Sequence, residues 1–381
     1  MHARSLRSLT RLPALAILLA GALAASAALV FRAPQVLVLA REGFPGAVWP
    51  ASGAFAVVEG ARPADPPPGA APPAPALDRI TKSAGRALLV DRGGTLTVEA
   101  YGEGLGRDTR LNSYSLVKSL IGALALRAVA DGRIAGLDVP LRDLLGPEAP
   151  PVTLGEALTM TSGLAMAPDP PKTANRPLDD AGFSPFGPLA RLHAYGIEKV
   201  MPGLRVDEAA RGTFRYQSAN TALLGLALER AYGRPLPDLL SGLIWRPAGA
   251  ADARWRRVPG GEGVSAYCCL YARPLDWLRV GRFLLGNGTP DVPFLPDPLW
   301  REFALPDLDP KVRREGVYGA HIRHDMLDRP GEAIAGPFAY LMGHGGQMVY
   351  LLPDENAVVV RFGERPQLLH STLYELFALD P

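Results

Sequence analysis

The chain of 381 residues has almost no cysteine, and the two that it has, Cys268 and Cys269, are neighbours. Adjacent cysteines close no useful loop and cannot hold a metal ion by themselves. The sequence therefore predicts neither a disulfide framework nor a cysteine metal site. We interpret the pair as two small buried apolar side chains rather than a vicinal disulfide or a reactive thiol, and their redox state stays open.

An excess of one charge is also missing. The 40 basic and 38 acidic residues give a net charge of +2 and are interspersed along the chain. No basic stripe with interleaved aromatics is present, which argues against binding of nucleic acid. His321 and His324 lack carboxylates or cysteines at ligand spacing, so we expect them at the surface or at a pocket rim. The sequence predicts no metal and no cofactor.

Charge is absent from Leu12 to Phe31, a run long enough to cross a bilayer as a helix. Three arginines precede it within the first eleven residues, which favours a cytoplasmic N-terminus. We predict that residues 1–31 are a signal peptide or membrane anchor. Cleavage near Ala25 and an uncut anchor both stay open. Either way, the rest of the chain is expected outside the cytoplasm, periplasmic or anchored to the inner membrane.

Regular patterns predict an α+β domain over residues 77–381, after a proline- and alanine-rich linker region at 32–76. A strand pair around Gly93–Gly94 opens the domain, helical periodicity dominates its middle, and period-two alternation returns from Phe338. We therefore expect an antiparallel sheet assembled from both ends of the domain and a mainly helical middle region. Helices are expected at 116–128, 218–233, 276–288 and near the C-terminus.

Ser115 and Lys118 stand three residues apart at a predicted helix start. Residues i and i+3 share a helix face, so the amine can act as the base that activates the hydroxyl. Leu116, Val117 and Leu120 provide an apolar setting that disfavours a charged lysine. A serine and a lysine at this spacing also arise by chance, so the pair gains weight only with further motifs.

Two further motifs follow in order, Tyr216-Gln217-Ser218 before a helix and His344-Gly345-Gly346 before a strand. Ser-x-x-Lys, Tyr-x-Ser and His-Gly-Gly in this order resemble the serine β-lactamase and penicillin-binding-protein superfamily. The segments "RLNSYSLVKSL", "VTLGEALTMTSGL" and "GHGGQ" are similar to those of class C β-lactamase-related esterases and amidases. Hydrolases of aminohexanoate dimers, the nylon-oligomer enzymes, share phrases similar to "EKVMPG" and "ARPLDWLRVGRFLL".

The resemblance implies the β-lactamase/transpeptidase-like fold and a serine hydrolase that acts through an acyl-enzyme on Ser115. Lys118 and Tyr216 would move the proton, and the backbone N–H groups of Ser115 and Gln347 would form an oxyanion hole. The resemblance also implies five substrate-binding residues, which are Tyr114, Ser218, His344, Gly345 and Gly346. The sequence leaves open whether Tyr114 lines the pocket or packs in the core.

Departures from the β-lactamase pattern bear on the substrate. His344 stands where β-lactamases have a lysine, and Ser218 stands where they have an asparagine; Ser218 also fits a helix N-cap. Esters or simple amides are therefore favoured over antibiotics. A D-amino-acid peptidase or carboxypeptidase acting on cell-wall peptides, and a non-catalytic penicillin-binding-like sensor, stay as alternatives. An α/β-hydrolase is excluded because no Gly-x-Ser-x-Gly pentapeptide occurs.

Overall fold

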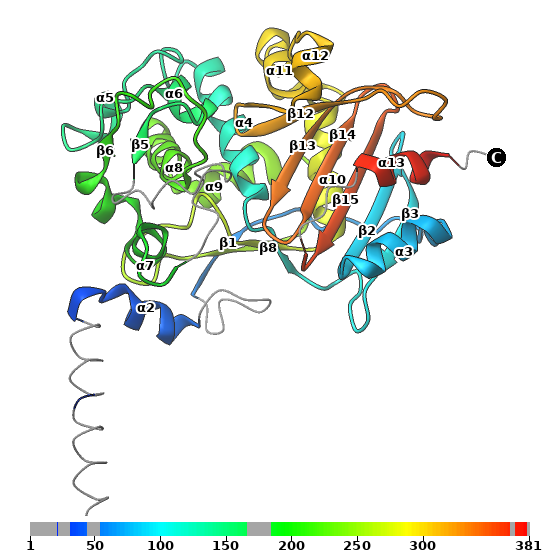
Figure 1. The fold of residues 1–381 in the computed structure, drawn as a ribbon, viewed down its shortest axis with the longest axis horizontal. Coiled ribbons are helices and arrows are strands. Elements are labelled where there is room, and N and C mark those ends of the chain that lie inside the picture. Colours follow the sequence, from blue (N-terminus) through cyan, green and yellow to red (C-terminus); the bar gives the residue numbers. More distant parts are fainter. Residues whose placement is uncertain (1–20, 22–30, 44–53, 166–183, 366–369, 379–381) are drawn as a thin grey trace, which may run out of the picture.

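The computed structural model describes residues 21, 31–43, 54–165, 184–365 and 370–378. Its centre is a seven-stranded antiparallel sheet in the order β11-β12-β13-β14-β15-β2-β3 (Figure 1). The first strand of the chain in this sheet pairs with the last one, so the sheet is assembled from both ends of the domain, as predicted. Its strands are β2 (Gly85–Arg92), β3 (Thr95–Tyr101), β11 (Val317–Gly319), β12 (Ile322–Leu327), β13 (Gly336–Gly343), β14 (Gln347–Leu352) and β15 (Ala357–Gly363).

Helices cover both faces of this sheet. Every residue of β14 and β15 is buried, because one face packs on α10 (Pro274–Leu285) and the other packs on α3 (Ala74–Lys82) and α13 (His370–Phe377). Both strands are therefore buried on both faces, which differs from the period-two alternation expected from the sequence. Strands β11 and β12 were not predicted, because β11 has only three residues and the apolar residues of β12 are interrupted by arginine, histidine and aspartate.

The helical middle region lies beside the sheet, on the side of β12 and β13 (Figure 1). Two helices in it are almost wholly buried, α4 (Leu116–Ala130) and α8 (Ser218–Tyr232), and they pack on each other. A helix that is apolar all round must lie inside a protein of this size. The other helices are α5 (Leu141–Leu145), α6 (Leu154–Thr159), α7 (Pro188–Val200), α9 (Leu236–Leu240), α11 (Asp297–Ala304) and α12 (Pro310–Arg314).

Residues 32–76 contact the domain at several points along their length, which differs from a free linker. Helix α2 (Gln35–Glu42) packs on α7, and strand β1 (Phe55–Val58) pairs with β7 (Ala253–Arg256). Ala56 and Val58 of β1 are buried, so this strand contributes to the core. The proline-rich stretch that follows contains neither helix nor strand up to α3. It still contacts the domain, because Ala70 bridges to Val98 and Asp65 pairs with Arg273. The second sheet has the order β1-β7-β8-β4, with β8 (Leu270–Ala272) and β4 (Leu111–Asn112).

The cysteine interpretation was half wrong. Cys268 and Cys269 are buried as expected, but the structure joins them in a vicinal disulfide. Cys269 has a left-handed backbone (φ 71°), which a side chain rarely adopts and which the pattern of apolar residues cannot reveal.

The predicted membrane segment lies almost wholly outside the described residues. In the part of the chain that the structure describes, no helix has the length and apolarity needed to span a bilayer.

Candidate active site

Ser115 precedes the first turn of α4 and makes no capping hydrogen bond with its side chain. Instead, its Oγ accepts a hydrogen bond from Nζ of Lys118 over 3.0 Å. Helical geometry places the two side chains on one face, as the spacing predicted. The hydroxyl and the amine are therefore in direct contact at a helix N-terminus, where the partial positive charge of the helix favours an anion.

Lys118 is only 3% exposed although it carries an amine. Its Nζ also donates to the main-chain oxygen of Tyr267 over 2.8 Å. Two aromatic rings flank it, with Nζ 5.0 Å from the ring centre of Tyr216 and 5.5 Å from that of Tyr267. The structure thus brings together the hydroxyl, the amine and the tyrosine that the sequence singled out.

The segment before Ser115 is held in an unusual conformation. Tyr114 has a left-handed backbone, with φ of 44°. Its N–H donates to Oδ1 of Asn112 over 2.9 Å, and its carbonyl accepts from the N–H of Cys269 over 3.3 Å. A strained backbone of this kind persists only where its surroundings fix it, and such positions cluster at functional sites.

The predicted glycine motif forms the turn between β13 and β14. Gly345 and Gly346 both have left-handed φ values, 77° and 78°, which explains why glycine stands there. The side chain of Gln347 closes the turn by donating to the carbonyls of His344 and Gly363, each over 2.7 Å. The role of the Gln347 main-chain N–H stays a prediction.

Arg361 is a residue of this site that sequence reasoning missed. It lies in β15 with no exposed surface, and its guanidinium donates to the carbonyls of Gly345 and Gly346 and to Oγ of Ser83. Burial lowers its pKa to about 10. A single charged residue inside the apolar run "AVVVRFG" was the signal that could have revealed it, since buried charges need dedicated partners.

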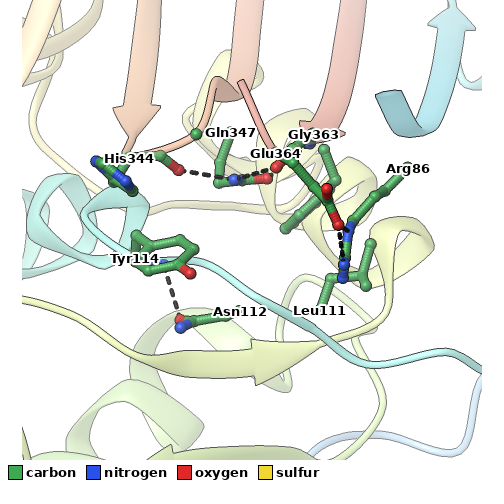
Figure 2. Close-up of a pocket in the computed structure, with 10 residues that line it drawn as sticks. Arg86, Leu111, Asn112, Tyr114, His344, Gln347, Gly363 and Glu364 are labelled. Atoms are coloured by element: carbon green, nitrogen blue, oxygen red, sulfur yellow. Dashed lines mark hydrogen bonds and ion pairs between the residues drawn. The ribbon is translucent and has the colours of Figure 1, made fainter. Parts of the chain in front are cut away.

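A pocket of about 280 Å³ opens beside the glycine turn (Figure 2). Four of its lining residues were predicted at the site, namely Tyr114, His344, Gly345 and Gln347. Ser115, Lys118 and Tyr216 do not line it, so the pocket does not contain these three predicted catalytic residues. The other lining residues are Arg86, Leu111, Asn112, Phe362, Gly363 and Glu364.

The rim of the pocket is aromatic and charged. The ring of exposed His344 meets that of Tyr114 edge to face at 5.4 Å, and Figure 2 shows both rings on the same side of the pocket. Arg86 and Glu364 form an ion pair across the pocket from them. Burial raises the pKa of the Tyr114 phenol, so it stays protonated near neutral pH. The pocket therefore presents both an apolar ring and polar groups to a ligand.

Ser218 is buried at the first residue of α8, and the residue before it, Gln217, is the N-cap. The predicted N-cap role of Ser218 is therefore wrong, because the helix begins one residue too early for it. The histidines were also misplaced. His321 and His324 are buried, and Nε2 of His321 lies 2.9 Å from Oγ1 of Thr221. Among the described residues, no cluster of side chains suits a metal ion.

The arrangement of Ser115, Lys118 and Tyr216 beside the antiparallel sheet can be compared with known proteins. The pattern of the beta-lactamase family matches residues 76–371. The chain belongs to the beta-lactamase family. The matched range includes all three motifs.

Solved structures of family-like proteins share the fold. A 6-aminohexanoate-dimer hydrolase from Bacillus anthracis is 17% identical, with a TM-score of 0.67 over 84% of this chain and 88% of that one. A hydrolase with promiscuous acyltransferase activity is 15% identical, with a TM-score of 0.58 over 80% and 95%. A class C beta-lactamase from Rhodobacter sphaeroides is 17% identical, with a TM-score of 0.55 over 79% and 96%. These likenesses confirm the α+β, class C β-lactamase-like fold.

Proposed function

We propose that the chain is a serine hydrolase that cleaves small esters or amides through an acyl-enzyme on Ser115. The observation that carries this proposal is the 3.0 Å contact between Lys118 Nζ and Ser115 Oγ, with the Tyr216 ring 5.0 Å from the same amine. Membership of the beta-lactamase family supports it. The rest of the reaction follows from these three groups.

Acylation begins when Ser115 loses its proton to Lys118 or Tyr216 while Oγ bonds to the substrate carbonyl carbon. The same pair returns the proton to the leaving alcohol or amine as its bond to that carbon breaks. Water then attacks the ester on Ser115, and the acid leaves as Oγ regains its proton. No further reactant is needed.

The oxyanion formed in each half-reaction needs N–H donors. The Ser115 N–H lies at the N-terminus of α4, and we place the second donor in the turn that ends at Gln347. Close approach supports this placement, because a Cβ added to Gly343 would lie 2.4 Å from the carbonyl oxygen of Ser113. The turn thus stands directly beside the segment that carries the nucleophile.

Esters and simple amides fit the site better than β-lactam antibiotics do. The antibiotic carboxylate needs a cation, and His344 at this position is exposed and engaged with the Tyr114 ring. Ser218, which replaces the amide-binding asparagine, is buried at a helix start. Substrate recognition therefore falls to the pocket beside Tyr114.

The test is a substrate panel on the purified full chain and on Ser115→Ala. We expect turnover of short p-nitrophenyl esters first, a linear amide dimer or D-Ala-D-Ala peptide less readily, and a chromogenic cephalosporin last. Ser115→Ala should abolish all turnover. Ser119→Ala, one turn further along α4, is the matched control because its hydroxyl bonds to the His321 carbonyl. An equal loss of turnover in both variants, or undiminished turnover in Ser115→Ala, would show that Ser115 is not the nucleophile.

We also propose that residues 1–31 carry the domain out of the cytoplasm. The support is the uncharged run from Leu12 to Phe31 behind three arginines. After expression in a Gram-negative cell, protease added to spheroplasts should digest the domain, and N-terminal sequencing tells anchor from signal peptide. A protease-resistant chain that starts at Met1 contradicts the proposal.

A further inference from the structure

A chain of buried polar contacts leads from Lys118 through Tyr267 to His193. Tyr267 provides the first two contacts, because its carbonyl accepts from Lys118 and its ring lies 5.5 Å from the same amine. The Tyr267 hydroxyl lies 3.0 Å from Nδ1 of His193 in α7. The two rings are also in contact, with centres 5.2 Å apart. Tyr267 is therefore held at both its main chain and its side chain.

His193 is held in turn by Arg256. One guanidinium nitrogen of Arg256 donates to the His193 carbonyl over 3.0 Å, and another donates to Oγ of Ser265 over 2.7 Å. The carboxylate of Glu42 binds the guanidinium with both oxygens, over 2.7 and 2.5 Å. Arg256 has no exposed surface and Glu42 is 6% exposed. A buried pair of this kind fixes geometry, because losing one partner leaves a charge without compensation.

Glu42 ends helix α2 and lies outside the residues 76–371 that match the family. A carboxylate from upstream of the family domain thus completes a network that reaches the active-site lysine. The linker prediction gave no sign of this role, since a single glutamate after an apolar run reads as an exposed helix end.

We propose that Tyr267 and His193 are positioning residues for Lys118, and that the Glu42–Arg256 pair anchors them. The inference rests on the proposed function. A lysine side chain is flexible, so its amine stays near Ser115 only if its other hydrogen-bond partner is fixed. Displacing a reacting group by about 1 Å can cost about 100-fold in rate. The Tyr267 carbonyl is that second partner, and the network fixes it.

The protonation of His193 is consistent with this role. Burial lowers its pKa well below the usual value, and the charges of Arg256 and Lys118 lower it further. His193 is therefore neutral near pH 7, and Nδ1 can remain the partner of the Tyr267 hydroxyl.

The test compares Tyr267→Phe and His193→Phe with wild type in the full chain. Each substitution keeps an aromatic ring and removes the hydroxyl–imidazole contact. We expect kcat and the rate of fluorophosphonate labelling of Ser115 to fall about 10-fold, while KM stays within about twofold, because the pocket is untouched. Tyr271→Phe is the matched control, since its hydroxyl is buried without a partner among the described residues.

Coupling and rescue separate positioning from a merely structural role. The double variant Tyr267→Phe/His193→Phe should lose no more than either single variant, because both remove one contact. His193→Asn, which keeps a polar atom near the Nδ1 position, should recover part of the kcat. Multiplicative losses, or Tyr267→Phe as active as Tyr271→Phe, overturn the proposal. Wild-type protein that is not labelled at Ser115 overturns the proposed function instead.

The anchor is tested by Glu42→Gln/Arg256→Met, which removes both buried charges at similar volume. Circular dichroism should show a native fold, and kcat should fall as in His193→Phe. If this variant does not fold, Glu42→Asp takes its place, because the shorter carboxylate cannot keep both contacts. Wild-type kcat in the folded variant overturns the anchoring role, with Glu59→Gln as an exposed control.

Discussion

At the scale of single residues, Gly343 marks a close approach between the sheet and the segment that carries Ser115. The sequence singled out the two glycines after it, which form the turn, and overlooked Gly343 because it ends a strand without any turn signal. Only the folded chain shows that a side chain there would meet the Ser113 carbonyl. A glycine within a strand often marks a site where another backbone segment approaches closely.

Gly343→Ala should therefore damage the active site. The added methyl lies 2.4 Å from the Ser113 oxygen, so the strand end or the nucleophile segment must shift. We expect kcat for p-nitrophenyl esters to fall about 100-fold. Gly319→Ala in β11, where a Cβ meets nothing within 4 Å, should keep wild-type kcat. Equal activity of the two variants would show that the turn does not approach Ser115.

The burial of His324 predicts how the free energy of unfolding depends on pH. It is 1% exposed, and neither ring nitrogen has a partner in the described structure. Burial, with the nearby charge of Arg313, lowers its pKa to about 3. Below pH 6.5 the unfolded chain binds a proton at this residue and the native chain does not, so stability falls as the pH drops from about 6.5 towards 3.

His324→Phe should remove this contribution. Between pH 7 and pH 5 it amounts to about 2 kcal/mol of unfolding free energy. Burial also lowers the pKa of His321 to about 3, so His321 should still reduce the unfolding free energy of both proteins as the pH falls. Urea denaturation of both proteins at the two pH values measures the difference. The same pH loss in wild type and His324→Phe would show that His324 is not buried in the neutral form.

At the scale of elements, the strands and helices with strong periodicity were predicted well. The Gly93–Gly94 hairpin, α4, α8, α10 and the strands from β13 to β15 all lie where the pattern indicated. Strands β1, β4, β7, β8, β11 and β12 were missed. They are short or polar, and the pairing of most of them depends on partners distant in the sequence. The candidate site shows the same difference. Ser115, Lys118 and Tyr216 lie in short sequence motifs and could be predicted, whereas Tyr267 lies in no motif and could not.

The Cys268–Cys269 disulfide lies between β7 and β8 and directly follows Tyr267. Without reductant, neither thiol of the denatured protein should react with iodoacetamide, and both should react after reduction. Cys268→Ala/Cys269→Ala should unfold at lower temperature, because the bond that holds residue 269 in its left-handed conformation is lost, and this conformation costs any residue with a Cβ about 1–2 kcal/mol. Cys268→Ala/Cys269→Gly should regain part of the loss. Alkylation of both thiols without reductant would contradict the bond.

At the scale of the whole molecule, the domain is wider than its family match. Residues upstream of position 76 add β1 to the second sheet and Glu42 to the network behind Lys118. Composition could not reveal this, because a proline-rich stretch separates these elements from the domain in sequence. The fold class, by contrast, followed from the order of strands and helices and from the resemblance.

The most direct test of the central claim is to locate the covalent adduct on the intact chain. The protein is labelled with a fluorophosphonate, digested and mapped by mass spectrometry. We expect one phosphonylated residue, Ser115, and slower labelling in Lys118→Ala and Tyr216→Phe. An adduct on another serine, or labelling of Ser115 at an unchanged rate in both variants, would contradict it.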